Sequence, residues 1–265
     1  MKTAILIVSF GSSNKQAVES TIIKLKEEIK SIFPSYCVKD VFASKIIVKL
    51  CKEKYNTIIQ NPKEALKELS ENGYEEVIIL PFYMTESESI KELSEDKINS
   101  ELEKKFKRII MCEPLIRYDR KTNKFIGEDF IEVLIDISLG KEEIIYMAHG
   151  SKNGDNLVYE AVQSRLLKQN MKNVNICLLE GRPTIEELIP RLIKKQIKRI
   201  ELCPMMLMGG KHVNVDLISD NKHSWKYILE KMNIEVSTSN KGLAENKSIR
   251  KLFIKRLIEA IEKVD

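Results

Sequence analysis

The chain lacks the short motifs that mark several common protein classes. Its five cysteines are scattered and form no C-x-x-C pair, which excludes the usual zinc and iron–sulfur spacings. No Walker sequence and no G-x-G-x-x-G turn occurs, which argues against nucleotide binding. Ser12 and Ser13 stand outside the G-x-S-x-G elbow of serine hydrolases, so that class is not favoured either.

Long apolar runs and export signals are also missing. The first apolar run, over residues 4–8, is too short to span a membrane, and no signal-peptide cleavage region follows it. The cysteines are odd in number and widely separated, as is usual for reduced thiols. We therefore expect a cytoplasmic protein with no membrane partner.

Charge of one sign is not concentrated anywhere along the sequence. Lysine and arginine number 44 against 39 aspartates and glutamates, and the formal net charge of +5 only weakly favours an anionic ligand. The sequence has no Arg-rich stripe, zinc-finger spacing or RNP-like aromatic motif, so we expect no nucleic-acid partner. With 10 glycines and 7 prolines, long disordered tracts are not expected.

Short β-branched apolar runs alternate with longer amphipathic stretches along the whole chain. This alternation is typical of parallel strands joined by crossover helices, so the predicted fold class is α/β. Apolar residues recur at helical spacing over 14–32, 183–196 and 247–263. The predicted strands are Ala4–Ser9, Val38–Phe42, Glu76–Leu80, Arg108–Cys112, Glu143–Ala148, Val174–Leu179, Arg199–Cys203 and Ile234–Ser237.

The two halves of the sequence line up around their strand ends, which indicates an internal duplication. The turn Ser9–Ser12 matches Ala148–Ser151, and in both a glycine lets the backbone turn sharply into a helix. One strand further on, Phe42 falls opposite Glu180, and the first half carries an additional helix near residues 47–60.

We expect two similar domains, each a parallel sheet flanked by helices, with an active-site cleft between them. The predicted ranges are 1–125 for the N-terminal domain and 126–265 for the C-terminal domain. Packing of the C-terminal helix on the first domain stays open as an alternative.

Polar side chains follow three strands of the second half. Ligands of open α/β sheets bind beyond the carboxyl ends of the strands, and His149, Glu180 and His212 all occupy such positions. A lone histidine or glutamate at a strand end is usually structural. Here, however, two of only three histidines lie at glycine-flanked strand ends in one half, which favours a joint site.

The first half has no comparable set. Its aligned residues are Phe10, Phe42 and Ser89, none of which is a strong metal ligand or a base at neutral pH. The third histidine, His223, lies in a polar turn and is interpreted as structural. Two imidazoles and a carboxylate form a metal-ligand set that leaves coordination positions open, and Co²⁺, Fe²⁺, Ni²⁺ and Zn²⁺ all accept such ligands.

At these residues the sequence resembles the class II chelatases, and more closely the anaerobic sirohydrochlorin cobaltochelatases. The likeness covers nearly the whole chain. It rests on Val8–Ser12, Met147–Gly150, Glu180 followed by Pro183, Pro204–Leu207, Gly210–His212, Asp220–Trp225 and Gly242–Asn246. The turn before His212 departs from the family pattern, because a lysine stands where an acidic residue is expected.

The resemblance implies a lyase that inserts Co²⁺ into sirohydrochlorin during cobalamin biosynthesis, with His149, Glu180 and His212 as metal-binding and catalytic residues. Co²⁺ would be a substrate, Fe²⁺ or Ni²⁺ insertion is the nearest alternative, and no organic cofactor is expected. We favour His149 as the base that accepts a pyrrole proton. Residues expected to contact the tetrapyrrole are Phe10, Gly11, Ser12, Met84, Glu88, Met206, Gly210 and Lys211.

Two other functions stay open at this point. A non-catalytic tetrapyrrole or metal carrier would hold its ligand without needing a proton-accepting histidine. A two-lobed binding module for a small anion would need a basic cleft but not the three metal ligands. Lys211 and Arg182 are instead the candidates for binding the carboxylates of sirohydrochlorin. Homo-oligomerisation is left open.

Overall fold

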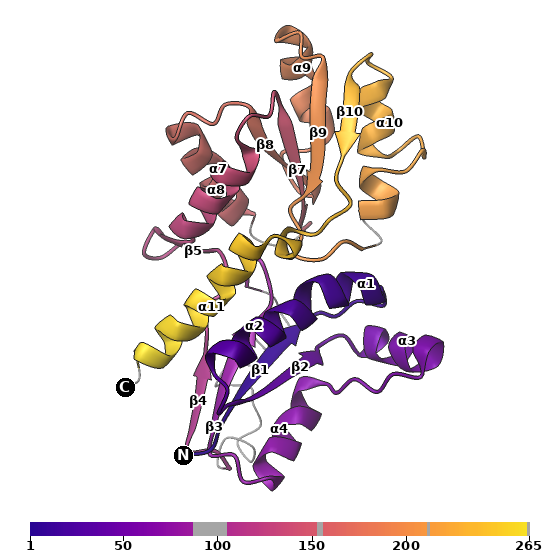
Figure 1. Ribbon diagram of the computed structural model, residues 1–265. Coiled ribbons are helices and arrows are strands. Elements are labelled where there is room, and N and C mark those ends of the chain that lie inside the picture. Colours follow the sequence, from indigo (N-terminus) through magenta and orange to yellow (C-terminus); the bar gives the residue numbers. More distant parts are fainter. Residues whose placement is uncertain (87–104, 153–155, 211–212, 264–265) are drawn as a thin grey trace. The chain divides into compact units, whose positions relative to one another are not determined.

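The computed structural model describes residues 1–86, 105–152, 156–210 and 213–263, which form two compact units (Figure 1). Unit 1 comprises Met1–Arg117 and Lys247–Asp265, and unit 2 comprises Tyr118–Asn246. Each contains a four-stranded sheet in which all neighbouring strands that are paired run parallel. The α/β class and the duplicated architecture expected from the sequence are therefore confirmed.

The eight predicted strands are all present, with ends within two residues of the predicted ones. The elements of unit 1 are β1 (Thr3–Ser9), α1 (Lys15–Val18), the π-helical turn η1 (Glu19–Ile23), α2 (Lys24–Ile32), β2 (Cys37–Phe42), α3 (Lys45–Tyr55), α4 (Pro62–Glu71), β3 (Glu76–Pro81), β4 (Arg108–Met111) and α11 (Lys247–Glu262). The additional helix of the first half is α3.

Unit 2 repeats the sheet topology of unit 1. Its elements are α7 (Glu128–Ser138), β7 (Ile144–Gly150), α8 (Leu157–Lys168), β8 (Val174–Glu180), α9 (Ile185–Lys194), β9 (Arg199–Pro204), the π-helical turn η2 (Val213–Leu217), α10 (Trp225–Glu230), β10 (Glu235–Thr238) and the 3₁₀ turn η3 (Leu243–Glu245). The strands β8-β7-β9-β10 correspond to β2-β1-β3-β4 of unit 1. Within the described ranges, no helix is both long and apolar enough to cross a membrane.

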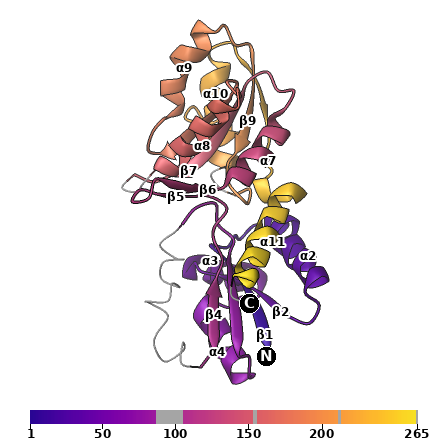
Figure 2. The ribbon, with the colours of Figure 1, turned by 90° about the vertical axis from the view of Figure 1, so that its left-hand side faces the viewer.

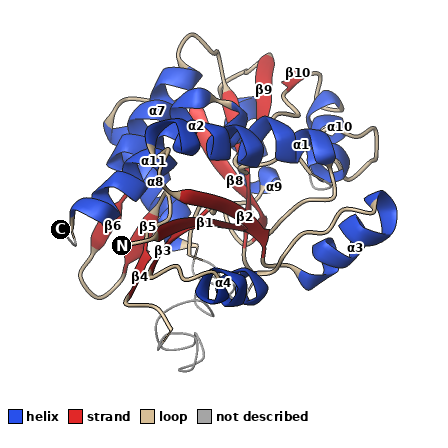
Figure 3. Cartoon of the chain, turned by 60° about the horizontal axis from the view of Figure 1, so that its bottom comes forward, coloured by secondary structure: helices blue, strands red, loops and turns tan. Residues whose placement is uncertain are grey.

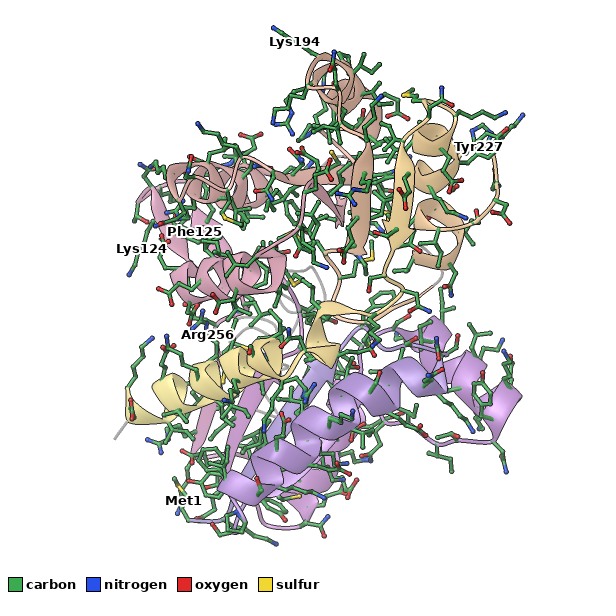
Figure 4. The ribbon with its side chains drawn as sticks, turned by 45° about the horizontal axis from the view of Figure 1, so that its top comes forward. Met1, Lys124, Phe125, Lys194, Tyr227 and Arg256 are labelled. Atoms are coloured by element: carbon green, nitrogen blue, oxygen red, sulfur yellow. The ribbon has the colours of Figure 1, made fainter. Side chains whose placement is uncertain are left out.

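A short hairpin not anticipated from the sequence opens unit 2. Its strands are β5 (Arg117–Asp119) and β6 (Lys124–Ile126), seen side by side in Figure 2. The ring of Phe125, labelled in Figure 4, lies 3.9 Å from the Arg165 guanidinium of α8. The units divide after Arg117, the first residue of β5, whereas the sequence suggested a boundary near residue 125.

In unit 1 the sheet, of order β2-β1-β3-β4, lies between two helical layers (Figure 3). All seven residues of β1 are buried, as a central parallel strand covered on both faces requires. On one face Ala65, Leu66 and Leu69 of α4 join the apolar side chains of the sheet. The other face is covered by α2 and by the C-terminal helix α11, which contacts β3 and β4.

The sheet of unit 2, of order β10-β9-β7-β8, is also covered on both faces. Ile185 and Leu192 of α9 share an apolar cluster with Trp225 and Leu229 of α10. On the opposite face, α7 packs against the sheet and its Ser138 hydroxyl lies 2.9 Å from the Tyr146 hydroxyl of β7. Helices on both faces therefore hold the strands, and with them the carboxyl ends of the strands, in place.

Candidate metal centre at the strand ends of unit 2

His149 is the first polar side chain at the carboxyl end of β7. Residues 144–148 of this strand are buried, and His149 is exposed. Its ring Nδ1 lies 3.1 Å from the Gly150 carbonyl oxygen, and because that oxygen can only accept, Nδ1 is the donor. The neutral ring then carries its lone pair on Nε2, which is the form that binds a metal or accepts a proton.

Glu180 ends β8, the strand next to β7. The parallel register pairs Ala148 with Leu178 and Gly150 with Glu180, so the two expected ligands lie at neighbouring strand ends. Gly150 has a positive φ of 68°, and a Cβ at this position would overlap the Glu180 carbonyl oxygen. A glycine is therefore needed here for the two strand ends to approach each other closely.

The third strand end, after β9, is anchored by backbone contacts. The Met205 amide donates to the Met147 carbonyl oxygen of β7 at 2.7 Å. The carbonyl oxygens of Met206 and Leu207 then accept from the Leu243 and Ala244 amides of η3, at 2.7 and 3.1 Å. This segment continues to Gly210, and the predicted residues Lys211 and His212 lie outside the described residues.

Of the predicted three-ligand set, the structure therefore describes His149 and Glu180. No group of three or more His, Cys, Asp or Glu side chains suited to a metal ion occurs among the described residues. His212 falls in a gap of the description, so its place in the set stays a prediction. Met206 is half-buried against the apolar cluster of unit 2, and Gly210 accepts from the Asn214 amide at 3.1 Å.

The matching strand ends of unit 1 carry the predicted apolar residues. Phe10, at the position of His149, is 54% exposed, an unusual degree for a large aromatic side chain. Gly11, at the position of Gly150, has a φ of 93°, and a Cβ here would lie 2.5 Å from the Phe42 ring. Both repeats thus place a glycine against the end of the next strand.

The other residues expected to contact the tetrapyrrole lie near the same edge of unit 1 or are not described. The half-buried Ser12 accepts from the Asn14 amide at 3.1 Å through its hydroxyl. Met84 follows β3 and is 9% exposed. Glu88 lies outside the described residues.

Comparison with known proteins identifies the family. Residues 3–262 match the cobalt chelatase (CbiK) family. The chain belongs to this family. It is 24% identical to the sirohydrochlorin cobaltochelatase of Salmonella typhimurium, over 98% of this chain and 97% of the relative. It is 23% identical to the sirohydrochlorin cobaltochelatase CbiKC of Nitratidesulfovibrio vulgaris, over 100% of this chain and 92% of the relative.

Solved structures agree on the fold. SirB from Bacillus subtilis with Fe³⁺ superimposes with a TM-score of 0.63 at 16% identity, covering 98% of this chain and 96% of that one. The sirohydrochlorin chelatase SirB from Bacillus subtilis subspecies spizizenii in complex with cobalt gives 0.64 at 15% identity, covering 99% and 97%. The resemblance to chelatases drawn from the sequence is confirmed.

One basic side chain that the sequence suggested for anion binding in this cobalt chelatase already has a partner. The Arg182 guanidinium donates to the Glu187 carboxylate, and this hydrogen bond lowers the pKa of Glu187. Glu187 also completes a capping box with Thr184 at the start of α9. Arg182 therefore contributes less positive charge to a ligand than its sequence position suggests.

Two contributors near the candidate centre were missed at the sequence level. Asn156 bonds the loop that follows His149, and Leu243 and Ala244 hold the segment that leads to residue 211. A signal for the second was present, since Gly242–Asn246 belongs to the family pattern. A Cβ at Gly242 would meet the Met208 Cα, which explains the glycine.

Proposed function

We propose that this protein inserts Co²⁺ into sirohydrochlorin and releases two pyrrole protons. The observation that carries the proposal is the setting of His149. This histidine donates from Nδ1 to a backbone carbonyl beside the end of the Glu180 strand, in a chain that belongs to the cobalt chelatase family. The names of the two curated relatives, both sirohydrochlorin cobaltochelatases, support the choice of substrate.

The chemistry of insertion needs a metal that is held weakly and a base close to it. We propose His149 Nε2, the Glu180 carboxylate and His212 as the ligands of the incoming Co²⁺. Three protein ligands leave coordination positions through which ring nitrogens can take over the ion, whereas a closed four-ligand site would retain it. Imidazole and carboxylate are suitable donors for Co²⁺.

Each insertion replaces two ring N–H bonds by metal–nitrogen bonds. We propose that His149 accepts one of these protons at Nε2 once the metal has moved to the ring. Histidine suits this role because its charge changes near neutral pH. The second proton leaves through Glu180, His212 or water.

The macrocycle is flat and partly apolar, and its carboxylates surround it. We propose that residues at the strand ends of each unit, and in the segments that follow them, contact it. In unit 1 these are Phe10, Gly11, Ser12 and Met84, together with Glu88; in unit 2 they are Met206, Gly210 and Lys211. Phe10 supports this best, because its ring is 54% exposed at the strand end that matches His149.

We further propose a cytoplasmic location. All five cysteines are unpaired thiols, the form expected in a reducing compartment.

Anaerobic metallation tests the proposal directly. Purified protein is mixed with sirohydrochlorin and Co²⁺, and the absorbance change is followed for wild type, His149→Ala, Glu180→Gln and His212→Ala. Loss of a general base is expected to lower kcat by about 10²- to 10⁴-fold in His149→Ala. The assay is repeated with Fe²⁺ and Ni²⁺, because the ligand types do not separate these ions.

The matched control is His223→Ala. His223 is exposed in a turn of unit 2. The hydrogen bond described for it runs from its backbone amide to the Asn221 side chain at 3.0 Å, and the substitution leaves this bond in place. It should metallate as fast as wild type. If the wild-type protein accelerates metallation with none of the three metals, the chelatase proposal is rejected and a non-catalytic carrier remains.

A further inference from the structure

We infer that Asn156 is a positioning residue that sets the orientation and tautomer of His149. The role of Asn156 in metal insertion rests on the proposed function. It starts from a hydrogen-bonded chain in unit 2 that links Asn156 to the imidazole through a single peptide group.

The Asn156 side chain forms two hydrogen bonds with the backbone of Ser151, the residue that follows Gly150. Its Oδ1 accepts from the Ser151 amide at 3.0 Å, and its Nδ2 donates to the Ser151 carbonyl oxygen at 2.9 Å. The Ser151 N–H belongs to the same peptide group as the Gly150 carbonyl. That carbonyl is the acceptor of His149 Nδ1.

Fixing one end of a planar peptide group fixes the other end. With its N–H held by Asn156, the peptide between Gly150 and Ser151 presents its carbonyl oxygen to His149 in one direction. Hydrogen bonds in such a chain also strengthen one another. The proton is thereby kept on Nδ1, and Nε2 is kept as the metal ligand and base.

Asn156 holds the Ser151 backbone instead of capping the helix that it begins. It is the N-cap residue of α8, yet its side chain makes no capping hydrogen bond. The asparagines that begin two other helices do cap: Asn14 accepts from the Ala17 amide at 3.2 Å and Asn61 from the Glu64 amide at 3.0 Å. Asn14 begins the equivalent helix of the other repeat, so the difference belongs to the repeat with the histidine.

The same side chain also rests on the loop that follows Glu180. A Cβ at Gly181 would overlap the Asn156 Nδ2, so only glycine lets the amide come this close. Asn156 therefore contacts the residue after Glu180 while it holds the peptide after His149. A single side chain thus contacts the backbone just after both His149 and Glu180, the two proposed metal ligands that the structure describes.

Histidine tautomers can be read without metal or tetrapyrrole. The chain has only three histidines, so the ring nitrogens of the full-length protein can be resolved by ¹⁵N NMR and assigned with His149→Ala. In wild type, Nδ1 of His149 is expected to carry the proton. In Asn156→Ala the ring is expected to become a mixture of both tautomers. Asn156→Asp keeps the acceptor for the Ser151 amide but loses the donor to the Ser151 carbonyl oxygen, so it should restore only part of the wild-type signal.

Titration with Co²⁺ alone gives the functional readout. Removing an outer partner of a ligating histidine typically weakens metal binding ~10- to 100-fold, and this is expected for Asn156→Ala. Asn61→Ala is the matched control, because it removes an asparagine N-cap of unit 1 and should leave Co²⁺ affinity and the His149 signal unchanged.

The outcomes separate the two hypotheses. An unchanged tautomer and unchanged Co²⁺ affinity in Asn156→Ala would overturn the inference, even if wild type metallates sirohydrochlorin. A changed tautomer with weakened Co²⁺ binding would support it, even if wild type fails to metallate sirohydrochlorin and the proposed function is rejected.

Discussion

Burial controls the chemistry of three thiols in the two units. It raises the pKa of Cys112, Cys177 and Cys203 to about 12, and nearby carboxylates, Glu113 and Glu201 among them, add to the shift. Cys112 and Cys177 are almost wholly inaccessible, at 2% and 1% exposure. A thiol reacts as its thiolate, so these groups are inert near neutral pH.

We predict that iodoacetamide at pH 8 leaves Cys112 and Cys177 unmodified in the folded protein and labels both in urea. With a pKa of about 12, roughly 10⁻⁴ of each thiol is ionised at this pH, and access is blocked as well. Peptide mass spectrometry measures the labelling, and the half-buried Cys37 serves as the internal comparison. Equal labelling with and without urea would contradict the burial of these residues.

The same shifts set the direction of alkaline denaturation. Above about pH 9 the unfolded chain loses thiol protons that the folded chain retains up to about pH 12. The folded state then binds more protons than the unfolded state, so the free energy of unfolding falls as pH rises through this range.

At the residue scale, the sequence was sufficient to place a side chain where a simple pattern fixes its position in the fold. His149 and Glu180 could be placed because each stands beside a glycine at the end of an apolar run. Asn156 could not, because an asparagine before a helix reads as an N-cap. Its actual bond, to a residue five positions earlier, depends on a loop conformation that no periodicity encodes.

Among the elements, the strands were predicted closely, whereas the sequence left open which domain α11 packs on. A buried parallel strand is an apolar run with few alternatives, whereas an amphipathic pattern shows that a helix has a buried face but not which sheet it covers. Arg250 and Arg256 of α11 are both buried, which settles the matter. The Arg250 guanidinium donates to both carboxylate oxygens of Glu28 in α2 at 2.8–3.2 Å. Arg256, labelled in Figure 4, donates to the Pro114 and Leu115 carbonyl oxygens.

We predict that Arg250→Met lowers the free energy of unfolding by about 3 kcal/mol, because it leaves the Glu28 carboxylate without its main partner. The side chains are 6% and 25% exposed, which places the effect at the lower end for a buried pair. Urea denaturation measures it. Lys251→Met, on the exposed side of the same helix, should stay within about 0.5 kcal/mol of wild type.

The double variant Arg250→Met with Glu28→Met provides a second check. If the cost of the single change comes from an unpaired carboxylate, removing that carboxylate should recover most of the lost stability. A double variant as unstable as the sum of both single variants would show that lost packing, not charge, is responsible.

At the scale of the whole molecule, unit 1 is built from both ends of the chain. Its last helix covers β3 and β4, and the Phe253 ring lies 4.8 Å from that of Phe82. Unit 2 is one continuous segment with its own apolar cluster. The repeat in the sequence revealed two units, but it could not show that the second one interrupts the first.

We predict that a chain ending at Asn246 keeps unit 2 folded and loses the native state of unit 1. Without α11, the apolar face of β3 and β4 is exposed to solvent. Glu28 and the Pro114 and Leu115 carbonyl oxygens also lose their arginine partners. Hydrogen exchange with mass spectrometry should show fast exchange in β1 and β3 and wild-type protection in β7 and β9. Fast exchange throughout both sheets would contradict independent folding of unit 2.

The interrupted unit also determines an order of events on the ribosome. The first 117 residues emerge with one helix of their final structure still unmade, and the ~130 residues of unit 2 must follow before that helix appears. At about 5–20 residues per second, the half-covered sheet waits roughly 6 to 26 s. During that interval the nascent N-terminal part is the form of this chain most in need of a chaperone.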